Sequence, residues 1–417
     1  MKGKTVAEKI FSNASGKDAM TGDYVWASPD LIYIHDVLGP LTISSLNRMG
    51  VAIPAFRGKT IFVFDHIFPP KDSASANNIL LMKKFASCLD IETIREGDGI
   101  EHTLLVEKGI IRPGMFVIGS DSHTVTAGGV GAMGVGMGST DIAATLALGQ
   151  NWFMVPESMR IILNGKLGKR VSGKDIILEI LRIVGADGAN YRSMEFSGPA
   201  LEHIGVDKRL AISNMTVEGG AKCGIVVPDE IVEKYYNAMG IDPELVLPDA
   251  GAKYESEIRL DLSDLTPKIS MPYSPANVHE LKDAIGTRID VAYLGNCANG
   301  TIGDLREAAE ILKGREVSAK TKLFIVPATR KIFQQALAEG IIKIFSDAGA
   351  IIAPSTCGAC AGLHMGVLGK GETAITNTNR NFRGRMGDPD SRVFLANSYV
   401  VAASAVSGQI VDPEESV

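Results

Sequence analysis

Three of the five cysteines stand in a pattern that suits a metal centre. Cys357 and Cys360 form a Cys-Gly-Ala-Cys motif, and Cys297 lies well upstream of it. Three thiolates can hold a zinc ion or three irons of a [4Fe–4S] cluster, whose remaining iron would be an open Lewis acid. The other two, Cys88 and Cys223, lie in helix-like or mixed apolar stretches, so we expect them to be ordinary buried cysteines.

A second group of residues suits proton transfer. Asp65 and His66 are adjacent, and a carboxylate beside an imidazole can keep the imidazole protonated near neutral pH. Such a pair could protonate a leaving hydroxyl group. The run Asp121-Ser122-His123 contains the residue types of a hydrolase triad. Neighbours in sequence point apart in regular structure, however, so this run does not predict a triad.

The segment 379–385 carries three arginines. Planar guanidinium groups bind carboxylates through two hydrogen bonds, so such a segment suits a substrate with two or three carboxylates. We expect Arg380 and Arg385 to bind substrate, and Arg383 to be a surface or structural cation.

Short apolar runs predict the strands that must position these groups. Runs typical of buried parallel strands occur at 61–64, 115–118, 291–294, 323–326 and 350–353. Helical spacing occurs between them, at 75–89, 304–312 and 330–345. Strands that alternate with helices predict an α/β fold with mainly parallel sheets. A proline-rich stretch that begins at Met271 and a weaker boundary signal near Pro156 suggest three α/β domains, 1–155, 156–270 and 271–417. Cys297, Cys357 and Cys360 fall in the third.

Four of these strands lead directly into the chemical motifs described above. They are followed by Asp65-His66, by 120–123, by Asn296-Cys297 and by the Cys-Gly-Ala-Cys motif. Ligands of open α/β sheets bind beyond the carboxyl ends of the strands. The placement therefore favours one site built from several strand ends.

Composition narrows the class of protein. The chain has 417 residues, 45% of them hydrophobic and 22% charged, and its net charge is −6. An acidic chain without basic runs argues against nucleic-acid or anionic-membrane binding. The start shows no signal peptide, no apolar run is long enough to span a bilayer, and the odd cysteine count does not indicate disulfides. We expect a cytoplasmic protein.

Glycine is abundant, with 45 residues, and it is concentrated at 128–138. Gly129 to Gly134 fits the letter of a GxGxxG motif. The preceding strand is too distant, and no acidic residue follows at the required spacing, so an NAD-dependent dehydrogenase is not favoured. A turn packed tightly beneath the site, leading into a helix capped near 139–141, is the preferred interpretation.

Taken together, the motifs resemble the large subunit of the aconitase superfamily, in its isopropylmalate dehydratase and homoaconitase branch. The resemblance runs in family order over nearly the whole chain. It is carried by segments 64–66, 101–102, 120–124, 194–196, 295–300, 357–360 and 379–385.

The resemblance implies three α/β domains around one [4Fe–4S] cluster held by Cys297, Cys357 and Cys360. It implies a hydro-lyase that isomerises a hydroxy di- or tricarboxylate, foremost 3-isopropylmalate and 2-isopropylmalate of leucine biosynthesis. Homoaconitate, 2,3-dimethylmalate and other alkylmalates are alternatives. Because the chain lacks the swivelling domain of full-length aconitases, the resemblance also implies a separate small subunit that bears it, in a heterodimer or heterotetramer.

The resemblance assigns roles residue by residue. The expected catalytic residues are Asp65, His66, His102, Asp121, His123 and Glu195. The expected substrate-binding residues are His35, Ser122, Asn379, Arg380 and Arg385. Glu195 would lie near the substrate hydroxyl or water. Asn296 and Ala298 replace the serine and threonine that the family carries around the first cysteine, a change that can alter the reactivity of the cluster.

Two other classes of protein remain as alternatives. In one, the three cysteines hold zinc or serve structure only, within a binding module. In the other, the chain binds RNA, as some cluster-free aconitases do; its acidity counts against this.

Overall fold

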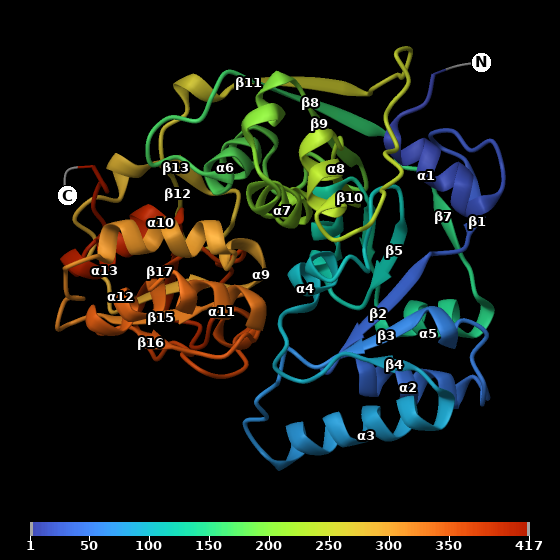
Figure 1. Cartoon of the computed structure of the whole chain (residues 1–417), viewed down its shortest axis with the longest axis horizontal. Helices are drawn as coiled ribbons and strands as arrows, with labels where there is room; N and C mark the ends of the chain where they lie inside the picture. Colours follow the sequence, from blue (N-terminus) through green and yellow to red (C-terminus); the bar gives the residue numbers. More distant parts are fainter. Residues whose placement is uncertain (1–2, 415–417) are drawn as a thin grey trace.

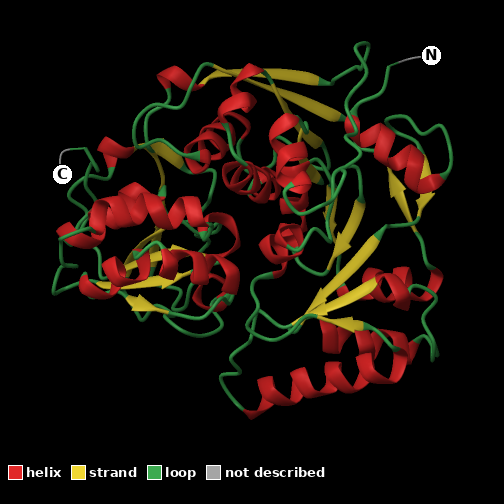
Figure 2. Ribbon diagram, viewed as in Figure 1, coloured by secondary structure: helices red, strands yellow, loops and turns green. Residues whose placement is uncertain are grey.

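Three large β-sheets follow one another along the chain (Figures 1 and 2). The computed structural model describes residues 3–414. The sheets are mainly parallel and helices cover them, so the predicted α/β fold class is confirmed. In Figure 1 the first sheet lies at lower right in blue, the second at the top, and the third at left in orange.

The first sheet has five parallel strands in the order β4-β3-β2-β5-β6. Its central strands are buried on both faces, as is typical of parallel sheets covered by helices. The strands are β2 (Leu31–His35), β3 (Thr60–Val63), β4 (Glu92–Thr93), β5 (Phe116–Gly119) and β6 (Met133–Gly136). The accompanying helices are α1 (Val6–Ser15), α2 (Gly39–Arg48), η1 (Arg57–Lys59), α3 (Ser73–Leu89), α4 (Glu101–Glu107), η2 (Ser122–Val130) and α5 (Ser139–Leu148). A separate antiparallel pair joins β1 (Tyr24–Ala27) to β7 (Asn151–Met154).

The second sheet has four parallel strands in the order β10-β9-β8-β11. They are β8 (Ser158–Asn164), β9 (Ser193–Ser197), β10 (Cys223–Val226) and β11 (Ser256–Asp261). The helices are α6 (Gly173–Val184), η3 (Pro199–His203), α7 (Val206–Asn214), η4 (Thr216–Gly219), α8 (Glu230–Asn237) and η5 (Leu262–Asp264).

The third sheet has seven strands in the order β13-β12-β18-β17-β14-β15-β16, and only its β12 pairings are antiparallel. The strands are β12 (Lys268–Ser270), β13 (Val278–Glu280), β14 (Val291–Gly295), β15 (Lys322–Val326), β16 (Ile351–Ile352), β17 (Thr373–Thr376) and β18 (Arg392–Leu395). The helices are η6 (Leu281–Asp283), α9 (Asn296–Asn299), α10 (Ile302–Leu312), α11 (Arg330–Ala338), α12 (Ile341–Asp347), η7 (Gly358–Ala361) and α13 (Ser398–Ser407).

The sheets change near the predicted domain limits at 156 and 271, although β12 lies just before the second limit and belongs to the third sheet. The limits themselves stay a prediction. The five predicted strands are present, with ends shifted by one or two residues.

Two local predictions were wrong. The helix expected over 330–345 is divided into α11 and α12, because Gly340 adopts a left-handed conformation with φ +74° between them. Cys88 is exposed on α3, whereas Cys223 is buried as expected. A periodic apolar pattern does not show which side of a helix the neighbouring elements cover.

The glycine-rich segment packs tightly, as predicted. It forms η2 and β6, and a Cβ atom on Gly128 would lie 1.6 Å from the carbonyl oxygen of Gly224 on β10. Helix α5 begins at Ser139 as expected, but no side chain caps it, because its N-cap residue is Gly138.

Within residues 3–414, no helix combines the length and the apolar character that crossing a bilayer requires.

Candidate active site

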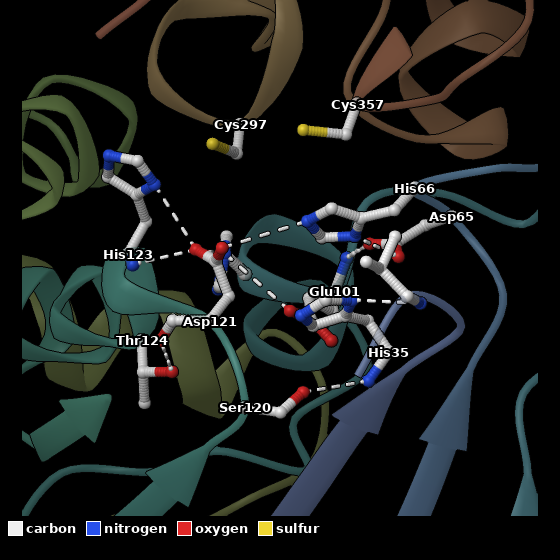
Figure 3. A network of polar contacts seen from close by, with 12 residues as sticks. His35, Asp65, His66, Glu101, Ser120, Asp121, His123, Thr124, Cys297 and Cys357 are labelled. Atoms are coloured by element: carbon white, nitrogen blue, oxygen red, sulfur yellow. Dashed lines mark hydrogen bonds and ion pairs between the residues drawn. The ribbon is translucent and has the colours of Figure 1, made fainter. Parts of the chain in front are cut away.

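The carboxyl ends of three neighbouring strands bring the proton-transfer residues together (Figure 3). His35 is the last residue of β2, Asp65 and His66 follow β3, and Asp121 follows β5. Because β3, β2 and β5 are adjacent and parallel, these ends meet at one edge of the sheet. His102 is added from the first turn of α4.

Asp121 is the centre of the network. Its Oδ1 atom lies 3.0 Å from Nε2 of His102 and 3.1 Å from Nδ1 of His123, and it accepts a hydrogen bond from the His123 amide at 2.7 Å. Its Oδ2 atom lies 3.7 Å from Nε2 of His66. Burial acts to raise the pKa of Asp121, but the hydrogen bonds from His102, His123 and His66 hold it well below the usual value. Asp121 is therefore the fixed negative charge around which three imidazoles are arranged.

His66 is the histidine of the network whose pKa is raised. Its Nδ1 atom lies 2.7 Å from Oδ1 of Asp65. Burial acts to lower the pKa of His66, but the charges of Cys357 and Asp65 outweigh burial and raise it well above the usual value. In Figure 3 the side chains of Cys297 and Cys357 lie above His66, and His35 lies below it. Asp36 fixes the turn by accepting the amides of His66 and Ile67 at 3.0 and 3.1 Å.

His35 and His102 remain neutral. The His35 ring stacks on His66 with centroids 3.9 Å apart, and burial, followed by the charge of His66, lowers the pKa of His35 to about 3. Burial also lowers the pKa of His102. Its Nδ1 atom lies 2.9 Å from the hydroxyl of Tyr33, and since Asp121 accepts at Nε2, the Nδ1 atom is left to accept from Tyr33.

Two carboxyl groups that the sequence analysis did not assign belong to this region. Oε1 of Glu218 lies 3.0 Å from Nε2 of His123 and accepts from Nε of Arg380 at 2.7 Å. Glu101 is fully buried, and neither carboxyl oxygen has a hydrogen-bond partner among residues 3–414. Burial, followed by the charge of Asp65, raises the pKa of Glu101 well above its usual value.

The structure does not bring Glu195 to this site. Its carboxylate accepts the amide of Val6 at 2.9 Å and the hydroxyl of Tyr254, so it joins the N-terminal segment to the second sheet. The structure thus places Glu195 away from the residues with which it was predicted to act, whereas Glu218 lies beside His123. The sequence feature that could have pointed to Glu218 is the segment 214–218, in which Asn214 and Glu218 lie about one helical turn apart.

The three cysteines face the network from the third sheet. Cys297 follows β14, while Cys357 and Cys360 flank the start of η7 beyond β16, and all three are buried. The Asn379 side chain links two of them: its Nδ2 atom lies 3.5 Å from Sγ of Cys297, and its Oδ1 atom lies 3.3 Å from Sγ of Cys360. Nδ2 of Asn214 also approaches Sγ of Cys297, at 3.4 Å.

Asn296, which stands where the family carries a serine, has a structural role that was not evident from the sequence. It adopts a left-handed conformation with φ +69°, which asparagine tolerates better than serine or threonine. Its Nδ2 atom donates to the carbonyl oxygens of Thr356 and Cys357 at 2.9 and 3.0 Å. The side chain thus ties the first cysteine segment to the second.

The remaining predicted residues lie around this centre. Ser122 begins η2 beside Asp121. Arg380 is held by Glu218, and Arg385 is close enough to Cys360 for their charges to interact. The Nε atom of Arg385 is buried without a hydrogen-bond partner in the described chain. Arg383 is exposed and pairs with Asp390 at the surface, which agrees with its prediction as a surface cation.

Comparison with known proteins identifies the class. The aconitase family model (aconitate hydratase) matches residues 8–288 and 283–408. The 3-isopropylmalate dehydratase large subunit of Campylobacter concisus is 45% identical over 99% of both chains. The 3-isopropylmalate dehydratase large subunit 1 of Methanopyrus kandleri is 43% identical over 99% of both. The holo-form of aconitase X from Thermococcus kodakaraensis matches with a TM-score of 0.51 at 16% identity, covering 88% of this chain and 89% of that one.

The fold and the site thus define an enzyme of the hydro-lyase class. This chain belongs to the aconitase family. Membership implies a [4Fe–4S] cluster, and the cysteines provide a test of that implication.

The three buried cysteines supply the thiolate ligands that such a cluster needs. Some histidines and carboxylates of the site, such as His102, Asp121 and His123, have their ligand atoms within 4.8 Å of one another. Among the described residues, the three cysteine sulfurs do not form such a compact group. Sulfurs around one zinc ion would lie about 3.8 Å apart, given a tetrahedral Zn–S distance of about 2.3 Å. A hydrogen bond from Cys357 lowers the pKa of Cys360 to about 5, and Arg385 adds to this effect. Three buried thiols are the donor type that the iron–sulfur cluster implied by the family requires.

Proposed function

We propose that this chain is the large subunit of a 3-isopropylmalate dehydratase, which interconverts 2-isopropylmalate and 3-isopropylmalate by dehydration and rehydration. The observation that supports it most is the meeting of an acid–base network with three buried thiols at strand ends of two sheets. The full-length similarity to several 3-isopropylmalate dehydratase large subunits supports the choice of substrate.

In this proposal Cys297, Cys357 and Cys360 hold one [4Fe–4S] cluster. Its iron without a protein ligand would supply a Lewis acid for the substrate hydroxyl and carboxylate. Asn214 and Asn379 direct amide groups at the sulfur of Cys297, and such bonds orient the ligands and tune the cluster.

His66 is the proposed acid for the leaving hydroxyl. The charges of Cys357 and Asp65 raise its pKa against the effect of burial, and its Nε2 atom lies 3.7 Å from Oδ2 of Asp121. Neutral His102 assists by orienting Asp121, and neutral His35 packs against the His66 ring to position substrate or water. His123 and Glu218 connect this network to Arg380.

Arg380 and Arg385 are the proposed carboxylate-binding residues, with Ser122 and Asn379 beside them. The unpartnered Nε of Arg385 fits this role. The name "large subunit" of the relatives supports a separate small subunit for this chain too. We propose that it brings the swivelling domain, including the base that removes the proton from carbon, in a heterodimer or heterotetramer.

The test is anaerobic reconstitution with iron and sulfide, with and without the small subunit encoded in the same genome. Formation of the unsaturated diacid from 2-isopropylmalate is followed by its ultraviolet absorbance, with homocitrate and 2,3-dimethylmalate as competitors. The proposal predicts turnover only when both subunits are present, and a preference for isopropylmalate. Full turnover by the single chain, or a preference for either competitor, would contradict it.

A further inference from the structure

Lys174 is a fully buried lysine for which the proposed reaction has no use. It lies in the first turn of α6, on the second sheet's side of the molecule. Its Nζ atom donates to the carbonyl oxygens of Asn377 and Thr378 at 3.1 and 2.5 Å and to Sδ of Met215 at 3.0 Å. No carboxylate oxygen lies within 4.0 Å of this Nζ in the described part of the chain, since none of the ion pairs includes it.

This position is unfavourable for a cation on two counts. Complete burial removes the hydration of the ammonium group. The first turn of a helix carries the positive end of the helix dipole, which repels a positive side chain. Neutral acceptors satisfy its hydrogen bonds but do not balance its charge, so a nearby negative group should provide the compensation.

The cysteine site supplies that negative charge. Burial lowers the pKa of Lys174 to about 8, and among the charges that act against burial Cys360 comes first, ahead of Asp304 and Glu218. The two carbonyl groups that Lys174 binds belong to the two residues just before Asn379. The side-chain amide of Asn379 in turn contacts the sulfurs of Cys297 and Cys360.

The base of α6 is fixed against the third sheet by other contacts. Oδ1 of Asp175 accepts the amide of Lys268, and its Oδ2 accepts the Asn397 side chain at 2.8 Å. Lys174 is therefore held at a defined place behind the segment that leads into Asn379.

We propose that Lys174 is a positioning residue for the iron–sulfur group, acting as a buried cation. It holds the 377–378 backbone that presents Asn379 to the cysteine sulfurs, and it offsets the negative charge of the thiolate-bound cluster. The inference rests on the cluster assigned under the proposed function. A nearby positive charge stabilises the reduced, more negative form of a cluster, so Lys174 raises its reduction potential.

The test compares reconstituted holo-protein carrying Lys174→Met, Lys174→Gln or Lys174→Arg. The matched control is Lys268→Met, because Lys268 is also buried but pairs with Glu280 and Glu179. The readouts are iron and sulfide content, the midpoint potential followed by electron paramagnetic resonance, and the thermal unfolding temperature.

The neutral variants are expected to shift the oxidised-to-reduced ratio at the wild-type midpoint at least about ten-fold toward the oxidised form, or ~59 mV for one electron. Lys174→Arg should restore most of the shift, and Lys268→Met should lower the unfolding temperature without moving the midpoint. A folded neutral variant that no longer retains iron, while Lys174→Arg does, also supports the proposal. A neutral variant with full iron content and the wild-type midpoint would overturn it, and so would neutral variants that fail to fold even without iron. A wild-type chain that takes up no cluster would instead refute the proposed cofactor.

Discussion

The two faces of the site differ in the kind of group they present. The face from the first sheet consists of imidazoles and carboxylates that hydrogen-bond to one another around Asp121. The face from the third sheet presents thiols contacted by neutral amides, with Asn379 between two of them. Acid–base chemistry needs neighbouring titratable groups whose pKa values differ. A metal group instead needs ligands whose orientation and basicity are tuned by neighbouring hydrogen bonds. The two kinds of chemistry are thus kept on separate sheets within one site.

The largest expected effect comes from the cysteine face. Replacing Cys297 by Ser should reduce activity to background and lower the iron bound per chain, because a cluster ligand is lost. The network around Asp121 should stay folded. Iron analysis and an activity assay check this, with Cys223→Ser as the control, since Cys223 is buried in β10 away from the site. Equal losses in both variants would show that the effect is general destabilisation.

Asp121→Asn should damage the other face alone. Activity is expected to fall by about 10²–10⁴-fold, the range for losing an acid–base group, since three imidazoles lose their shared carboxylate. Iron content should be unchanged. Asp72→Asn is the control, because Asp72 caps α3 at the surface through the amide of Ser75. If Asp121→Asn removed iron as well, the separation of the two faces would be wrong.

Variants of Glu218 and Glu195 test which of the two glutamates belongs to the site. Glu218→Gln should lower kcat by about 10- to 100-fold, as expected for a partner that orients a functional group, because Glu218 links His123 to Arg380. Glu195→Gln should lower the unfolding temperature but leave kcat within about two-fold. Steady-state kinetics and thermal unfolding of both variants decide the matter, and the reverse pattern would restore Glu195 to the site.

The smallest expected effect is a shift in pH dependence. The acid His66 must be protonated, so the rate falls as the pH rises through its folded pKa, which lies well above the usual value. Asp65→Asn removes a negative charge that raises this pKa, so the alkaline limb should move to lower pH by about one unit or more. The pH profile of kcat/KM measures it, and an unchanged alkaline limb would mean that another group sets it.

The sequence predicts some of these features because they are local. Polar residues directly after apolar runs predicted which strand ends would meet, and the cysteine spacing predicted the thiol face. The partners of Glu195 and Glu218 depend instead on packing between distant segments: Val6 contacts one and Arg380 the other. Glu195 was a candidate because segment 194–196 carries the family resemblance, whereas Glu218 lies outside the segments that carry it.

Lys174 gives no signal in the sequence. It lies in an ordinary amphipathic helix, and a lysine there is normally expected at the surface. Its burial depends on the packing of α6 against α7, Met215 and segment 377–378. Similarly, the exposure of Cys88 depends on which face of α3 the first sheet covers.

The most direct test of the account is metal and sulfide analysis of the anaerobically reconstituted wild-type chain. We expect about four irons and four sulfides per chain, bound through Cys297, Cys357 and Cys360. One zinc ion without iron or sulfide would contradict it.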